Sequence, residues 1–500
     1  MAALLGVGVR GVKTAWEPQN ASIKALIAET CYGIARRHES RLEEMITGMT
    51  DLAVIVLAAG MGTRMKSAVP KVLHKAAGRS LLGHVLSAAT ALSPQLVVVV
   101  HGPGTEHEAV KWEAVRSAPG CLLAEQPERK GTGHAVMMAE NALKDFSGNI
   151  LVLYGDVPLV RPETLNTLLA QLSKTQPMAV LGFEAADPTG YGRLLMRGKT
   201  IQAIREHKDV TAAQRKVRLC NSGIVAISSR HLWPLLHNLK PANAQGELYL
   251  TDVVEMLAKA KHKVGLSMCD QEETAGVNDR IQLAHVEGVL QKRLRAAAML
   301  NGATLIDPKS VFLCADTKIG KDVVIEPNVV FGPGVSIGDR VEILASCHIE
   351  GAAIASGARI GPFARLRPGA VIGENAHVGN YVEIKKAKLG KGAKANHLTY
   401  IGDAEVGAGS NIGAGTITCN YDGYEKHQTM IGENVFVGSN TALVAPVSVG
   451  AGANIAAGSV ITTDVPADAL AMTRAPLTQK AGWAKRYRAI KAAKKQSKAS

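Results

Sequence analysis

A large apolar residue returns at every sixth position over much of the stretch from Val311 to Val465, often with a glycine after it. These positions are Ile319, Ile325, Phe331, Ile337, Ile343, Ile360, Leu366, Ile372, Val378, Ile384, Ile431, Val437, Leu443, Val449, Ile455 and Ile461. A period of six fits neither an α-helix nor an ordinary strand. It fits short strands joined at tight corners, with one apolar residue of each side pointing to a common axis. The pattern therefore predicts a parallel β-helix whose interior is filled, so that function belongs to its outer surface.

The repeat is expected to break twice, from Lys385 to Tyr400 and from Thr418 to Met430, and polar residues gather in both segments. His397 lies in the first of them. An unperturbed imidazole, with a pKa of about 6.5, can accept a proton from an amine at neutral pH. A histidine in such a loop is more often a solvated turn residue, so the pattern alone leaves both interpretations open.

The first half of the chain has a different pattern, in which apolar strands alternate with helical segments. Strands are expected at Leu52–Leu57, Leu96–Val100, Ile150–Leu153 and Met178–Phe183, and helices at Leu81–Ala91 and Thr132–Leu143. This alternation predicts an α/β, Rossmann-like domain with a largely parallel sheet covered on both faces. Ligands of such sheets bind at the carboxyl ends of the strands, where Gly60-Met61-Gly62 and Gly155-Asp156 occur.

A helix from Asn278 is expected to join the two halves, because apolar residues follow at spacings of three and four until Asn301-Gly302. The predicted organisation is an N-terminal extension (1–49), the α/β domain (50–277), a linker helix (278–302), the β-helix (303–482) and a basic tail (483–500). Met45 and Met49 precede the first strand, and we expect one of them to be the true start, with little fixed structure before it.

The amino-acid composition limits where this protein can be located and what it can bind. The seven cysteines show no paired or metal-binding spacing, which indicates reduced thiols and a cytoplasmic location. No apolar run approaches the roughly 20 residues of a membrane span. Half of the net charge of +14 comes from seven basic residues between Trp483 and Ser500. The simpler interpretation of this tail is a solvated terminus, and the alternative is a segment that attracts phosphate or a membrane surface. No nucleic-acid partner is expected.

The loop Gly60-Met61-Gly62-Thr63-Arg64 is expected to open a helix and to offer backbone N–H groups and a cation to a polyphosphate, with Lys71 as a second cation. It matches neither the GxGxxG dinucleotide pattern nor the P-loop.

With the motifs that follow it, this loop resembles the signature of sugar nucleotidyltransferases. The matching motifs are Leu57 to Met65, Pro70-Lys71, Gln126, Gly131 to Ala135, Tyr154 to Pro158, Gly190 to Arg193, Glu206 to Asp209, Asn221 to Gly223 and Val277 to Asp279. Together with the β-helix, the chain resembles, from about Asp51 to Trp483, the family of bifunctional bacterial enzymes that make UDP-N-acetylglucosamine. In that family the β-helix is left-handed, the molecule is a homotrimer and the acetyl site is shared between subunits.

The resemblance implies a UTP and UDP-N-acetylglucosamine site in the first half. Its residues would be Leu57, Ala58, Ala59, Gly60, Lys71, Gln126, Gly131, Thr132, Tyr154, Gly155, Asp156, Gly192, Glu206, Asn221 and Asn278. Asp156 and Asn278 would bind Mg²⁺ through hard oxygen atoms. Arg64 and Lys71 would act catalytically by neutralising charge on the leaving pyrophosphate. No protein base is required, since the attacking phosphate is already ionised, and His134 is expected to be structural.

For the second half the resemblance implies transfer of an acetyl group to an amino sugar, with His397 as the catalytic base. Arg367, Lys385, Tyr400 and Asn411 would bind glucosamine 1-phosphate, and Glu383 would orient or stabilise His397. The residues expected to bind acetyl-CoA are Ala414, Asn420, Tyr421, Ser439, Ala457 and Arg474.

Two departures from the family pattern and two alternatives remain. Pro127-Glu128-Arg129-Lys130 replaces a more apolar stretch, and Ser222 stands where threonine is more usual, which leaves nucleotide selectivity less certain than reaction type.

The alternatives are a nucleotidyltransferase of single activity with a structural or regulatory β-helix, and a trimeric scaffold or binding module.

Overall fold

The computed structural model describes residues 51–104 and 107–496 of the chain. The expected extension 1–49, with Met45 and Met49, lies outside this part. The described residues form two compact units, one of residues 51–61 with 85–274 and the other of residues 62–84 with 275–496. The segment 62–84, which the sequence places in the first domain, thus groups with the second unit.

A nine-stranded sheet forms the centre of the first unit. Its strands are β1 (Leu52–Ala58), β4 (Leu96–His101), β5 (Leu122–Glu125), β6 (Asn149–Tyr154), β7 (Met178–Glu184), β8 (Gly192–Arg197), β9 (Thr200–Arg205), β10 (Leu219–Ser228) and β11 (Val264–Met268). The main path runs β11-β7-β10-β6-β1-β4-β5, and β8 and β9 branch from β10. The four expected strands are present, and β1 lies between β6 and β4.

The prediction of a largely parallel sheet holds only in part. β1 is parallel to β4 and β6, and β4 to β5, but β10 runs antiparallel to both β6 and β7. An apolar strand has the same composition whichever way it runs, so its direction could not be predicted from the sequence. The sheet is mixed.

Helices cover this sheet on both faces. They are α3 (Glu108–Ser117), α4 (Thr132–Met137), α5 (Pro162–Leu169), α6 (Ser229–Leu236) and α7 (Asp252–Lys259), and α2 (Leu81–Thr90) precedes β4. Ile55 and Val152 pack in one core with α4, α6 and α7. The residues between them along the strands, such as Val54 and Leu151, point to the opposite face and are equally buried.

The linker helix is α8 (Arg280–Leu300), two residues later than expected at its start. Its N-cap is Asp279, whose carboxylate accepts the Gln282 N–H, while the Gln282 side chain accepts the N–H of Asn278. This reciprocal arrangement resembles a capping box. Asn301 ends the helix, as expected, and Gly302 follows with a φ of 102°.

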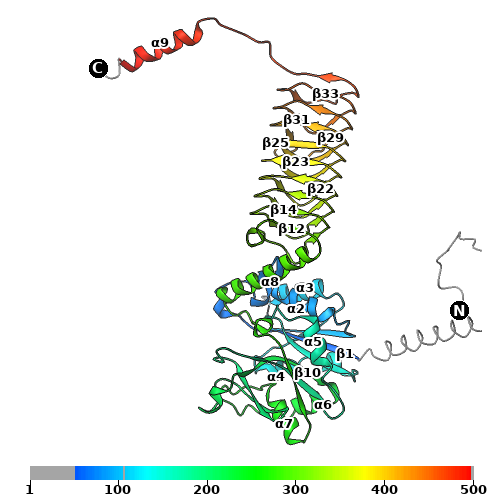
Figure 1. Cartoon of the computed structure of the whole chain (residues 1–500), viewed down its shortest axis with the longest axis vertical. Helices are drawn as coiled ribbons and strands as arrows, with labels where there is room; N and C mark the ends of the chain where they lie inside the picture. Colours follow the sequence, from blue (N-terminus) through cyan, green and yellow to red (C-terminus); the bar gives the residue numbers. More distant parts are fainter. Residues whose placement is uncertain (1–50, 105–106, 497–500) are drawn as a thin grey trace, which may run out of the picture. The chain divides into compact units, whose positions relative to one another are not determined.

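The second unit is dominated by stacked parallel strands that form a regular column (Figure 1). One ladder contains β12 (Thr304–Leu305), β14 (Val324–Ile325), β17 (Glu342–Ile343), β20 (Arg359–Ile360), β23 (His377–Asn380), β25 (Lys394–His397), β27 (Asn411–Ile412), β30 (Phe436–Val437), β33 (Asn454–Ile455) and β35 (Leu470–Ala471). The other strands are β13 (Lys318–Ile319), β15 (Val330–Phe331), β16 (Ser336–Ile337), β18 (His348–Ile349), β19 (Ala352–Ile354), β21 (Arg365–Leu366), β22 (Ala370–Ile372), β24 (Glu383–Leu389), β26 (Tyr400–Val406), β28 (Ile417–Cys419), β29 (Thr429–Ile431), β31 (Ala442–Val444), β32 (Val447–Val449) and β34 (Val460–Ile461). This is the predicted β-helix, and its architecture is that of left-handed hexapeptide-repeat folds.

The residues of the six-residue period fill the interior as predicted. All of them belong to one buried core, except Ile319, which is partly buried at its margin.

Only one of the two expected interruptions is real. Pairing residues of successive coils are 17 or 18 positions apart from Arg359 to His377, Lys394 and Asn411, so Lys385 to Tyr400 continues the stack. The polar residues there lie on strands β24 and β25 and in the turn between them, which is why the sequence pattern suggested a break. Asn411 and Phe436, by contrast, pair across 25 positions. The extra residues form an excursion, residues 420–428, between β28 and β29.

The basic tail contains helix α9 (Trp483–Gln496), in which no residue is buried. A solvated, frayed segment was the simpler expectation, and the structure gives a helix in which the rings of Trp483 and Tyr487 stack.

Candidate functional sites

The loop after β1 is compact but does not open an α-helix. Thr63–Met65 forms a single 3₁₀ turn, which ends at Lys66 in the left-handed conformation with a φ of 48°. The expectation of a helix N-terminus is therefore wrong, and no helix dipole acts here. Gly62 has a φ of 64°, and a Cβ atom on it would lie 2.4 Å from the Cβ of Lys71. Only glycine allows this approach.

Lys71 follows Pro70 in a second short turn, Lys71–Leu73, and its Nζ donates to Oδ1 of Asn278 at 3.0 Å. Two predicted residues 207 positions apart thus meet in the second unit. Asn278 is also held through its backbone by Gln282. Arg64 is exposed on the 3₁₀ turn.

Gln126 and the Gly131-Thr132 turn form one cluster at the carboxyl end of the parallel strands. The Gln126 side chain is 4 % exposed, and its Nε2 lies 3.2 Å from both the Gly131 carbonyl oxygen and Nδ1 of His134. Gly131 has a φ of 104°, and a Cβ there would collide with the backbone of Leu248. His134 holds Gln126, which agrees with the structural role expected of it.

Arg129, in the stretch that departs from the family pattern, donates from Nε to the carbonyl oxygen of Ala59 at 3.0 Å. It links the segment after Gln126 to the loop after β1. Arg129 was not among the predicted site residues. The unusual composition of residues 127–130 was the one feature of the sequence that pointed to it.

A cleft of about 430 Å³ collects most of the residues expected around the sugar. It is lined by Thr132, Tyr154, Gly190, Tyr191, Gly192, Glu206, His207, Lys208, Asn221, Ser222, Gly223, Gln245, Glu247, Tyr249 and Thr251. Five of these, from three strands, α4 and the residue after β9, were predicted from the sequence: Thr132, Tyr154, Gly192, Glu206 and Asn221. A Cβ on Gly192 would lie 3.3 Å from the Glu206 carboxylate, so glycine keeps that carboxylate against the backbone.

Electrostatics in this cleft disfavour extra negative charge. Burial raises the pKa of Glu206, although a hydrogen bond from Thr251 opposes the shift. Burial also raises the pKa of the Tyr154 hydroxyl, with Glu206 and Asp156 adding to the effect. Both groups are suited to hydrogen-bond an uncharged sugar hydroxyl or amide.

Asp156 follows β6 in a turn and is half-buried. Its carboxylate and the Oδ1 of Asn278 are the hard oxygen donors that Mg²⁺ prefers, and Mg²⁺ commonly takes only one or two protein oxygens. The donor set therefore fits Mg²⁺. Nowhere in residues 51–104 and 107–496 do three or more His, Cys, Asp or Glu side chains gather in a metal-binding group. Asp156 and Asn278 belong to different units, and their convergence on one ion stays a prediction.

The β-helix brings His397 into line with three of the residues expected to bind acetyl-CoA. The N–H of Gly415 donates to the His397 carbonyl oxygen, that of Asn440 to Ala414 and that of Gly458 to Ser439. These bonds stack His397, Ala414, Ser439 and Ala457 on the same corner of successive coils. The side chain of His397 is exposed, and its Nδ1 lies 2.8 Å from Oδ1 of Asn380.

A cluster of cations lies on the neighbouring face. Arg367 and Lys385 stack on adjacent coils, since the Arg367 N–H donates to Ile384. Lys426, from the excursion, contacts Lys385 and, with Arg367, lowers the pKa of the Lys385 ammonium by charge repulsion. Lys426 was not among the predicted site residues, although it lies in the segment where the six-residue period breaks.

The carboxylate of Glu383 pairs with a member of this cluster. It accepts from Nη1 of Arg367 at 2.8 Å and raises the pKa of that guanidinium. Glu383 and His397 thus have separate hydrogen-bond partners, Arg367 and Asn380. That Glu383 orients or stabilises His397 stays a prediction.

The remaining predicted residues lie within the excursion, on strands before it and beyond the last strand. Asn420, 8 % exposed, donates to the carboxylate of Asp403, and the exposed Tyr421 donates from its hydroxyl to the carbonyl of Gly423. Tyr400 and Asn411 are half-buried on β26 and β27, and Arg474 is exposed beyond the last strand.

Comparison with known proteins covers both halves. Residues 54–255 match the MobA-like NTP transferase domain, and residues 316–351, 351–386 and 428–463 match the bacterial transferase hexapeptide family. A protein of Azorhizobium caulinodans named bifunctional protein GlmU is 53 % identical over 440 residues, which cover 88 % of this chain and 98 % of that protein. The chain belongs to the GlmU family.

Other GlmU proteins are equally similar. Those of Parvibaculum lavamentivorans and Rhodospirillum rubrum are each 55 % identical, over 87 % and 88 % of this chain and 96 % and 98 % of their own lengths. Likeness to GlmU thus spans the sheet, α8 and the β-helix together. No helix in the described part of the chain has the length and apolarity to cross a membrane.

Proposed function

We propose that this chain catalyses two consecutive transfers. Acetyl-CoA and glucosamine 1-phosphate give N-acetylglucosamine 1-phosphate and CoA; this product and UTP then give UDP-N-acetylglucosamine and pyrophosphate. The observation that carries the proposal is the likeness to proteins named bifunctional GlmU along nearly their whole length, in both units.

Acetyl transfer is assigned to the corner of the β-helix that holds His397. The imidazole takes a proton from the amine, whose nitrogen bonds to the thioester carbonyl carbon, and the CoA thiolate leaves. Arg367, Lys385 and Lys426 form a site for the phosphate dianion, because these three neighbouring cations keep an excess of positive charge even with Arg367 paired to Glu383. Tyr400 and Asn411 orient the sugar. Ala414, Asn420, Tyr421, Ser439, Ala457 and Arg474 bind acetyl-CoA.

Uridylyl transfer is assigned to the carboxyl ends of the strands in the first unit together with Arg64, Lys71 and Asn278. Gln126, Gly131 and Thr132 bind the uracil, while Gly192, Glu206 and Asn221 hold the acetylated sugar. The phosphate oxygen of N-acetylglucosamine 1-phosphate attacks the α-phosphorus of UTP in line, and pyrophosphate leaves. Arg64 and Lys71 stabilise the charge that develops on it. Asp156 and Asn278 would hold Mg²⁺, which supplies charge neutralisation on the phosphates.

A cytoplasmic homotrimer is part of the proposal. The six cysteines in the described residues are all free, which is typical of a reducing compartment. On one corner of the β-helix Phe363, Tyr381 and Leu398 are 49 %, 57 % and 63 % exposed, and each has a φ between 51° and 57°. Exposed apolar side chains in a strained backbone are explained by a partner subunit that covers them.

The experiment that tests the proposal uses one variant in each unit. His397→Ala should lower acetyl transfer, measured as CoA thiol release, at least about 100-fold, the usual contribution of a general base. Asp156→Asn should lower uridylyl transfer, measured as pyrophosphate release with UTP and Mg²⁺. Each variant should leave the other activity near wild type. Loss of both activities in either variant, or of neither, contradicts the two-site proposal.

This experiment also separates the alternatives. A nucleotidyltransferase of single activity would release no CoA with glucosamine 1-phosphate, and a scaffold would show neither reaction. The names of the relatives and the line of His397 with the acetyl-CoA residues both favour two activities.

A further inference from the structure

We infer that Asn380 is the positioning residue that sets the tautomer of His397 and thereby makes Nε2 its basic atom. The inference rests on the proposed function, in which His397 accepts the amine proton. It is carried by one contact, the 2.8 Å hydrogen bond between Oδ1 of Asn380 and Nδ1 of His397.

The backbone holds this pair in register. Asn380 is the last residue of β23 and pairs with His397, the last residue of β25, in a parallel ladder. The Leu398 N–H donates to the Asn380 carbonyl oxygen at 3.0 Å. A Cβ atom on Gly379 would lie 1.9 Å from the Asn396 carbonyl oxygen, so glycine lets the two coils meet closely just before the pair.

His397 is fixed from its other side as well. Its carbonyl oxygen accepts from Oγ1 of Thr399 at 2.7 Å and from the N–H of Gly415 at 3.3 Å. The preceding coil thus bonds the Leu398 N–H and the following coil bonds the His397 carbonyl oxygen, so the backbone around the ring is held on both sides. The imidazole ring itself is oriented by its contact with Asn380.

The chemistry follows from the proton count. An amide oxygen only accepts hydrogen bonds, so the ring nitrogen facing it must carry hydrogen. A neutral imidazole has one N–H, and with that hydrogen on Nδ1 the lone pair is on Nε2. Free histidine favours the opposite tautomer, in which Nε2 carries the hydrogen and cannot accept a proton. Asn380 therefore selects the form that is competent as a base and keeps the ring in place while Nε2 becomes protonated.

Two variants of the full chain separate this role from simple packing. Asn380→Leu is similar in size but has no acceptor, whereas Asn380→Asp keeps an oxygen at the same place. We expect Asn380→Leu to lower kcat for acetyl transfer by about 10- to 100-fold, the loss typical when the hydrogen-bond partner of a metal-binding histidine is removed. KM for glucosamine 1-phosphate should change less than about 3-fold, since Asn380 is not among the residues that bind the substrate. Asn380→Asp should recover most of kcat.

The tautomer itself is measured by solid-state NMR of the sedimented full chain with ¹⁵N-labelled histidine rings. The signal of His397 is obtained by difference from His397→Gln. Wild type and Asn380→Asp should show a protonated Nδ1 at neutral pH, and Asn380→Leu should shift toward protonated Nε2. Uridylyl transfer, measured on the same samples, should be unchanged and reports that the chain is folded.

The outcomes are distinct. If Asn380→Leu keeps kcat within about 2-fold of wild type, or keeps the Nδ1-protonated ring, the inference is overturned while the proposed function stands. If His397→Ala itself retains acetyl transfer, the proposed function of this site fails. A loss in Asn380→Leu that Asn380→Asp also shows, with uridylyl transfer intact, overturns the acceptor role of the oxygen.

Discussion

Within each of the two proposed sites, a single side chain that the sequence pattern passes over makes a local contact. Arg129 bonds the carbonyl of Ala59 and Lys426 contacts Lys385. Neither belongs to a motif that could be recognised in one sequence. Their roles depend on loop conformations that bring together residues far apart along the chain.

Arg129 gives a prediction for UTP binding. In Arg129→Met the hydrogen bond to Ala59, worth about 1 kcal/mol, is lost, and the loop after β1 becomes less ordered. We expect KM for UTP to rise by about 5-fold, with acetyl transfer unchanged. Arg116→Met is the matched control, because Arg116 pairs with Glu113 on the surface of α3. Equal KM values for the two variants would contradict the role of Arg129.

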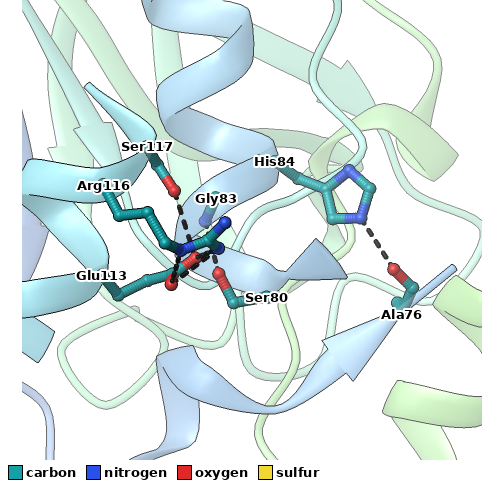
Figure 2. Close-up of polar contacts among 7 residues, drawn as sticks. All are labelled: Ala76, Ser80, Gly83, His84, Glu113, Arg116 and Ser117. Carbon is teal, nitrogen blue, oxygen red and sulfur yellow. Dashed lines mark hydrogen bonds and ion pairs between the residues drawn. The ribbon is translucent and has the colours of Figure 1, made fainter. Parts of the chain in front are cut away.

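At the scale of elements, the first turn of α2 and the segment before it surround the buried side chain of His84. Oγ of Ser80 accepts the Gly83 N–H at 2.9 Å, and Nε2 of His84 lies 2.8 Å from the Ala76 carbonyl oxygen (Figure 2). Figure 2 also draws the surface pair Glu113 and Arg116 of α3. His84 is 8 % exposed, and burial lowers its pKa below the usual 6.5.

This shift predicts a pH dependence of stability. A proton binds the unfolded His84 more strongly than the folded one, so the stability that neutral His84 contributes is present above about pH 6.5 and is lost as the pH falls toward its lowered pKa. His84→Gln can still donate to Ala76 but does not titrate. We expect the thermal midpoint of wild type to drop more between about pH 7.5 and pH 5.5 than that of His84→Gln. Parallel drops would exclude His84 as a source of the acid sensitivity.

Replacement of glycine by alanine is expected to have opposite effects on stability at two positions. Gly288 lies in α8, and a Cβ atom there would meet nothing within 4 Å, so Gly288→Ala should stabilise by about 0.5 to 1 kcal/mol through helix propensity. Gly379→Ala would place Cβ 1.9 Å from the Asn396 carbonyl oxygen and should destabilise the β-helix. Denaturant unfolding of both variants measures the two signs. A stabilising Gly379→Ala would show that the coils can separate at low cost.

Local pattern predicted the elements well where one rule dominates. The buried positions of the β-helix followed from the period of six, and β1, β4, β6 and β7 from their apolar runs. It failed where several structures share one composition. The segment Thr132–Leu143 is helical only to Met137 and then continues as a 3₁₀ turn at Asn141–Leu143, and the polar stretch after Lys385 stays within the stack.

At the scale of the whole molecule, the candidate sites came from motif resemblance rather than from periodicity. Five predicted residues line one cleft, Lys71 meets Asn278, and His397 aligns with the residues expected to bind acetyl-CoA. Asn380 could not be found in this way. Its importance depends on a distance of 17 positions that becomes a contact only when the coils stack.

The proposed trimer yields a prediction that separates assembly from the first reaction site. Phe363→Asp with Tyr381→Asp places charges on the exposed corner where the two rings stack at 5.2 Å. We expect sedimentation velocity to show dissociation, with acetyl transfer lost and uridylyl transfer retained, if subunits share the acetyl site. Trp112→Asp, at a residue 75 % exposed on α3, is the control. An intact trimer in the double variant would place the interface elsewhere.

The excursion at residues 420–428 lengthens one coil to 25 positions without disturbing the pairing on either side of it. A stack of repeating coils can therefore accept an insertion at one corner while the pairing of the neighbouring coils is kept. Exchange of this single loop offers a route to enzymes that accept other acyl donors or amines on an unchanged scaffold.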